Sequence, residues 1–276
     1  MPLTERVRRW RDESGDVQPL GLVRLVVGYF LFRQALHDLQ HAGAIGYFGD
    51  QFHIPMLPEA LVPSARGFLA LELLMMLLGA AAVVGVAARP ALLVAAPLGI
   101  YLLACDRMRY HHHLYTLYLT AFLLAFTPCD RSWTRGRRLA DERQGPLWAV
   151  RLLQLQLSII YLSSGGSKLF DRDWRSGRVL ADRIARWTSA SVDAGVPRKL
   201  LALLSSPVGG SLLAKGAIAT ELGVAIALWI PRTRRLAAAI GIAFHITIDF
   251  TAGVDIFSWL SIAILLLFWI YPTPSE

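Results

Sequence analysis

The sequence predicts an all-α, polytopic integral membrane helix bundle, with about eight transmembrane helices and additional amphipathic interfacial helices. Hydrophobic residues make up 55% of the 276 residues and charged residues only 17%, and the mean hydropathy is +0.46. An average soluble domain carries about 25% charged residues. The apolar residues also occur in blocks of about 20, which is the length that an α-helix needs to cross a bilayer. We therefore expect a single transmembrane domain that covers residues 1–276.

The basic charge of the chain fits a membrane topology better than nucleic-acid binding. The net charge is +8, but the arginines form short clusters between apolar blocks rather than a solvated basic face. Clusters of this kind are typical of cytoplasmic loops. We expect the lipid bilayer as a partner, no nucleic acid, and a location in the cell (plasma or inner) membrane. Only three of the 28 basic residues are lysines, a bias that favours a GC-rich, bacterial genome.

The first half of the chain predicts four spans. Residues 1–18 form a basic segment that we expect in the cytoplasm, and no small-residue cleavage site follows the first apolar stretch, so we expect that stretch to be retained. No Lys or Arg occurs between Arg33 and Arg66, which predicts an exoplasmic loop. The expected spans are residues 20–32, 67–88, 89–105 and 111–127.

The second half predicts four more spans. The interval 128–146 holds five arginines and is expected in the cytoplasm, whereas 168–206 mixes arginines with apolar residues in the manner of an amphipathic interfacial segment. The expected spans are residues 147–167, 210–230, 236–252 and 256–271. Eight spans place both termini in the cytoplasm.

Ionisable residues inside spans are functional candidates because burying each one costs roughly 2.5–3.5 kcal/mol. Arg24 could form a structural ion pair with Glu72 or Glu221. These charges also leave a transporter or channel open as a hypothesis, although no internal repeat is visible. The candidates are Arg24, Glu72, His113, Lys168, Lys215, Glu221, His245 and Asp249.

Lys168 lies at the end of an apolar helix, directly after the small residues 164–167. Small residues let other groups approach closely, and a lysine that loses its hydration there could act as a general base. The alternative is that its side chain reaches out to the membrane interface.

Histidines form two further candidate positions. His245 and Asp249 share a helix face at a spacing of four, so the carboxylate could orient the imidazole. The run 111–113 holds three consecutive histidines, which point in different directions on a helix and cannot bind one metal together. We predict no metal site, and zinc would require His245 or a carboxylate from another helix. An interfacial belt and a pocket role remain equally open for this run.

Six short motifs are spread over most of the chain: HHHLY (111–115), SGGSKL (164–169), DWRSG (173–177), Glu221-Leu222, Phe244-His245 and IFS (256–258). Together they resemble the horizontally transferred transmembrane (HTTM) domain family, to which the vitamin K-dependent γ-carboxylase belongs.

The resemblance implies quinone-linked chemistry in the membrane. It implies Lys168 as the catalytic base that acts on a reduced quinone of the vitamin K type at an exoplasmic-side pocket. The residues that it places around the quinone are His113, Tyr115, His245, Trp174 and Glu221.

Two departures from the family narrow this expectation. The chain stops at Glu276, without the lumenal portion that binds the protein substrate of the carboxylase, and the asparagine positions of the family segment are His111 and His112. We therefore expect an epoxidase-like activity, if any, rather than carboxylation of protein glutamate. The alternative is a non-catalytic membrane partner, which binds a protein or peptide in secreted-peptide maturation or in a membrane complex.

Overall fold

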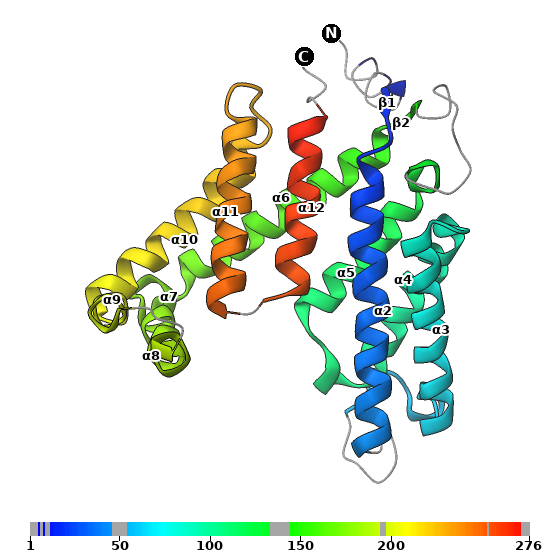
Figure 1. Cartoon of the computed structure of the whole chain (residues 1–276), viewed down its shortest axis with the longest axis horizontal. Helices are drawn as coiled ribbons and strands as arrows, with labels where there is room; N and C mark the ends of the chain where they lie inside the picture. Colours follow the sequence, from blue (N-terminus) through cyan, green and yellow to red (C-terminus); the bar gives the residue numbers. More distant parts are fainter. Residues whose placement is uncertain are drawn as a thin grey trace. The chain divides into compact units, whose positions relative to one another are not determined.

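The structure of the protein is a computed structural model that is almost entirely α-helical (Figure 1). It describes residues 5, 8, 12–45, 54–132, 144–193, 197–252 and 254–271. Half of the basic segment 1–18 and the arginines at 135–143 lie outside the described residues, so their predicted location stays a prediction. The chain divides into two compact units, residues 1–154 with 254–274, and residues 155–253.

Five helices build most of the first unit. They are α2 (Leu20–Ile45), α3 (Ala65–Val84), α4 (Ala88–Cys105), α5 (His112–Ala125) and α12 (Ile256–Ile270). Short 3-10 turns, η1 (Glu59–Leu61), η2 (Arg107–Arg109) and η3 (Cys129–Arg131), connect or follow them. The helix α6 (Trp148–Phe170) begins in this unit and ends in the other.

Helices α2 and α3 pack through two glycines, which allow their backbones to touch. A Cβ atom on Gly79 would lie 2.6 Å from the backbone nitrogen of Phe32, and one on Gly28 would lie 2.8 Å from that of Val83. Both distances are shorter than any ordinary contact, so only glycine fits. Small residues at such positions are the usual means of close helix packing in membranes.

A short β-ribbon fixes the start of the first unit to its helices. Strand β1 (Ser14–Asp16) pairs antiparallel with β2 (Gln144–Pro146), with Gly15 opposite Gly145. Arg151 at the start of α6 is almost fully buried and donates to both carboxylate oxygens of Glu13, at 2.5 and 3.2 Å. The buried guanidinium is thus paired, as burial of a charge requires.

The second unit consists of the end of α6 and five further helices. These are α7 (Arg172–Arg175), α8 (Arg178–Asp193), α9 (Arg198–Leu204), α10 (Pro207–Ala227) and α11 (Arg234–Ala252). Gly177 joins α7 to α8 with a φ of +81°, and its α carbon lies against α10, where a Cβ would come within 2.0 Å of the Ser211 nitrogen. A left-handed conformation and a backbone contact together require glycine here.

Three described helices are long and apolar enough to cross a membrane: α3, α4 and α10. A fourth apolar helix, α12, has 15 residues and spans about 22 Å, less than the ~30 Å of a bilayer core. The membrane character of the fold is therefore supported, whereas eight membrane crossings are not established.

Two sequence-based boundaries are wrong. The first span was expected at 20–32, but α2 continues to Ile45, because Arg33 can remain helical while its exposed side chain pairs with Asp255. The interfacial segment was expected from residue 168, but α6 continues to Phe170. The chain turns at Asp171, whose side chain caps α7 by accepting from the Asp173 and Trp174 amides.

Candidate functional site

Lys168 lies in the second unit, in contact with an acidic partner on another helix. Its Nζ donates to Oε1 of Glu221 on α10 at 2.5 Å and to Oγ of Ser164 at 2.9 Å. Ser164 Oγ donates to the same Glu221 oxygen at 3.1 Å. The Lys168 side chain is 17% exposed and that of Glu221 6% exposed, so the pair is largely shielded but the amine keeps some access to its surroundings.

The geometry of this pair follows from the spacing of residues on α6. Tyr161, Ser164 and Lys168 are separated by three and four residues, so they lie on one helical face. Gly165 borders this face, and a Cβ there would lie 2.9 Å from Leu222 and 3.2 Å from the Cβ of Glu221. The absence of a side chain at Gly165 therefore lets α10 bring Glu221 up to the lysine.

Trp174 covers the amine from α7. The Nζ of Lys168 lies 4.9 Å from the centre of the Trp174 ring, within the range of a cation–π contact. Asp171 is the N-cap of α7, and its Oδ1 accepts from the backbone amide of Trp174 at 2.9 Å. This bond fixes the position of Trp174, the third residue of the helix. An aromatic face and a carboxylate thus both contact the same amine.

His245 lies in the same unit, on α11, and is fully buried. Its Nε2 is 2.8 Å from the hydroxyl of Tyr161, which comes from the face of α6 that carries Lys168. Lys168 and His245 lie within electrostatic range of one another, as do Tyr161 and Glu221. The structure therefore brings together four of the six predicted site residues: Lys168, Glu221, Trp174 and His245.

The other two predicted residues, His113 and Tyr115, lie on α5 in the first unit. His113 is half-buried, with its ring centre 5.2 Å from that of His111. Tyr115 is 43% exposed and lines a pocket of about 540 Å³ between α4 and α5, which is within the usual size of a small-molecule site. Apolar and aromatic residues form the rest of this wall, among them Pro97, Ile100, Tyr101, Tyr118 and Phe122.

Sequence reasoning missed some of the polar residues that these sites use. Ser164 and Tyr161 contact predicted residues, and their spacing from Lys168 on one helix was the signal that could have identified them. Arg109 forms ion pairs with Asp38 and Glu72 in the first unit. The sequence predicts loops between spans at Asp38 and Arg109. Charged residues are common in such loops, so neither residue was identified as a functional candidate.

The remaining candidates have other contacts. Arg24 does not follow the expected pairing, because Glu72 pairs with Arg109 and Glu221 pairs with Lys168, and Arg24 donates to backbone carbonyls of Ala82, Val83 and Ser132. Within the part of the chain that the structure describes, no cluster of three His, Cys, Asp or Glu residues is arranged to hold a metal ion.

The family model for the HTTM domain matches residues 13–271, which is nearly the whole chain. No solved structure matches the chain.

Proposed function

The chain belongs to the HTTM domain family and is a membrane protein, and on that premise we propose that it uses Lys168 as a general base on a reduced quinone of the vitamin K type. The observation that carries this proposal is the contact of the Lys168 amine with Glu221 and Ser164 at the end of an apolar helix. Such a constellation can hold a proton, release it and take it back at one defined atom.

Glu221 gives Lys168 a way to become a base. Oε1 of Glu221 accepts the hydrogen bond from the Lys168 ammonium, so it is placed to take up the proton that the lysine releases. Transfer of the ammonium proton to Oε1 of Glu221 leaves an amine with a free electron pair. That amine can then accept the hydroxyl proton of a quinol, which leaves the quinol as its oxyanion beside the lysine ammonium.

The surroundings of the amine suit a flat aromatic substrate. Trp174 offers a ring face beside Lys168, and Tyr161 with His245 offers a hydrogen-bonding pair in the same unit. We propose that Trp174, Glu221 and His245 of the second unit line the quinone site. His113 and Tyr115 of the first unit are quinone-binding residues in the same proposal, which for these two follows from the family resemblance. The second carboxylate oxygen of Glu221, Oε2, is buried and has no hydrogen-bond partner among the described residues. It can therefore accept a hydrogen bond from a substrate hydroxyl.

The topology belongs to the same proposal. We propose a multi-pass protein of the bacterial cell membrane with about eight crossing helices, both termini in the cytoplasm and the Lys168 site toward the exoplasmic side. Arginine clusters between the helices support this orientation.

The test is epoxide formation from the reduced quinone. The protein in lipid nanodiscs is supplied with vitamin K hydroquinone and oxygen, and the quinone epoxide is measured by mass spectrometry. In this reaction one hydroquinone and one O₂ molecule give one quinone epoxide and one water molecule. We expect epoxide from the wild type and none from Lys168→Met. Lys215→Met removes an exposed lysine from α10 in the same unit and serves as the matched control with unchanged activity.

Equal epoxide yields from wild type and Lys168→Met would overturn the role of the base. No epoxide from folded wild-type protein would overturn the enzymatic proposal. That result would favour the alternative function. In that case the protein is a non-catalytic membrane partner that binds a protein or peptide in secreted-peptide maturation or in a membrane complex. Co-purification of a stoichiometric partner with both variants would then support it.

A further inference from the structure

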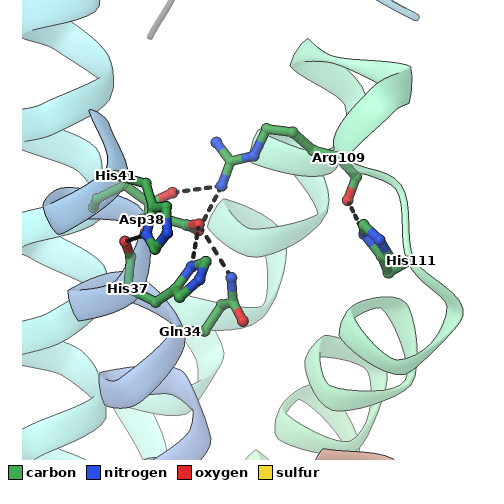
Figure 2. Close-up of polar contacts among 7 residues, drawn as sticks. Gln34, His37, Asp38, His41, Arg109 and His111 are labelled. Atoms are coloured by element: carbon green, nitrogen blue, oxygen red, sulfur yellow. Dashed lines mark hydrogen bonds and ion pairs between the residues drawn. The ribbon is translucent and has the colours of Figure 1, made fainter. Parts of the chain in front are cut away.

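The first unit contains a second buried charged cluster, independent of the Lys168 site. We call it the Asp38 cluster, and it consists of Gln34, His37 and Asp38 on α2, Glu72 on α3 and Arg109 on η2. Figure 2 shows the guanidinium of Arg109 extending toward Asp38, with Gln34 and His37 on the same helix as the carboxylate. Glu72 is the eighth residue of α3, one of the helices long and apolar enough to cross a membrane.

The charges of this cluster do not balance. A single nitrogen of Arg109, Nη2, lies 2.5 Å from Oδ2 of Asp38 and 3.1 Å from Oε1 of Glu72. Arg109, Asp38 and Glu72 are 9%, 7% and 2% exposed. Two ionised carboxylates on one guanidinium would leave one uncompensated negative charge away from water, which costs several kcal/mol. A bound proton removes that charge.

The hydrogen bonds indicate which carboxylate holds the proton. Asp38 receives donors from three sides: Arg109 Nη2, Gln34 Nε2 at 3.1 Å and the His37 ring, whose Nδ1 is 3.4 Å from Oδ1. Donors stabilise the ionised form of a carboxylate. Glu72 is deeper, has the longer contact to Arg109, and lies within hydrogen-bonding range of Asp38. The proton therefore belongs on Glu72, which donates it to Asp38.

Among the described residues of α3, α4 and α5, the groups that face the cluster carry no positive charge. Phe68 of α3 stacks under Arg109, with its ring centre 4.5 Å from the guanidinium carbon. Tyr118 of α5 and Cys105 of α4 lie within electrostatic range and are neutral groups. Asp106 accepts from the backbone amides of Ile54 and Met108.

Histidines of neighbouring turns complete the surroundings of the cluster. The His111 ring contacts the backbone oxygen of Arg109 at 3.0 Å, and so engages the main chain rather than the carboxylates. His37 itself is 58% exposed in its side chain and stacks on the exposed His41 at 3.9 Å between ring centres. An imidazole ring has two nitrogens that can each carry a proton, so the partly exposed His37 ring can pass a proton between water and Asp38.

We propose that Asp38 and Glu72 together bind one proton inside the membrane helices of the first unit and exchange it with water through His37. The ligand of this site is the proton itself, shared between two carboxylates beside a fixed guanidinium. The site gives the protein a proton store within an apolar helix pair, whether or not Lys168 acts on a quinone.

Infrared spectroscopy of the full-length protein in nanodiscs tests the proposal, because a protonated carboxyl group has a carbonyl stretch apart from the carboxylate bands. At neutral pH we expect one such band, which shifts in deuterated water, and which is lost in Glu72→Gln. Asp38→Asn should also lose it, since Glu72 can then ionise against Arg109. Glu59→Gln, an exposed acid of the same unit, is the control that keeps the band.

Stability and exchange rate distinguish a shared proton from a purely structural network. Either single neutral variant should unfold near the wild-type temperature, because one carboxylate still balances Arg109, whereas Asp38→Asn with Glu72→Gln should unfold clearly lower. His37→Gln should slow deuterium exchange of the band severalfold, and His112→Gln should not. A band that survives Glu72→Gln, or its absence from the wild type, would overturn the site, and an unchanged exchange rate in His37→Gln would overturn the route.

Discussion

Arg24 of α2 is fully buried, and its guanidinium donates to the backbone carbonyl of Ala82, near the end of α3, at 2.5 Å. The same guanidinium donates to the carbonyls of Val83 and Ser132, both at 3.0 Å. The last carbonyls of a helix have no partner within the helix. A buried arginine thus closes the end of α3 by donating to backbone carbonyls.

Replacement of this arginine should therefore cost stability. In Arg24→Met the three carbonyls lose a buried donor, and we expect a loss of about 2–4 kcal/mol. Arg33→Met, on the same helix, removes an exposed ion pair with Asp255 and should cost less than about 1 kcal/mol. Thermal unfolding in detergent, followed by circular dichroism, measures both, and equal losses would contradict the capping role of Arg24.

The case of Arg24 shows what sequence reasoning could and could not predict. Runs of apolar residues predict helices, because each run must satisfy its own backbone in a membrane. The described chain is helical where these runs occur, although only α3, α4 and α10 are long and apolar enough to cross a membrane. The partners of buried charges depend on which helices pack together, and Lys168 meets Glu221 across 53 residues of sequence. Arg109 lies in a short turn and is buried where it contacts Asp38 of α2 and Glu72 of α3.

Gly177 offers a second test of packing. Gly177→Ala would force a Cβ to within 2.0 Å of the Ser211 nitrogen and would also strain a φ of +81°. We expect the second unit to lose about 3 kcal/mol. Gly216→Ala is the matched change, because a Cβ there meets nothing within 4 Å; it should be neutral or stabilise α10 by up to about 1 kcal/mol. Limited proteolysis and thermal unfolding should rank the two variants in this order.

Cys129 predicts a pH dependence of stability. It lies in η3 outside the candidate spans, and burial raises the pKa of its thiol from 9.0 to about 11. The unfolded chain therefore loses this proton first as the pH rises. Stability should fall between about pH 9 and pH 11, by roughly 2.7 kcal/mol in total. The difference in unfolding temperature between wild type and Cys129→Ala should shrink in this window, and a constant difference would contradict the shift.

The Lys168–Glu221 pair can be separated into its structural and chemical roles with a double-mutant cycle. Lys168→Met leaves Glu221 shielded, with Ser164 as its one remaining donor among the described residues, so it should destabilise the second unit by about 1–3 kcal/mol. Glu221→Gln should cost less, because Lys168 keeps Ser164 and its partial exposure. The double variant should be more stable than Lys168→Met alone, with a coupling energy of about 0.5–3 kcal/mol. Thermal unfolding of all four proteins gives the coupling, and additive losses would show that the two side chains do not act as a pair. If Lys168 is the base, the double variant should be more stable than Lys168→Met but should form no more epoxide. The reason is that the second substitution does not restore an amine at position 168.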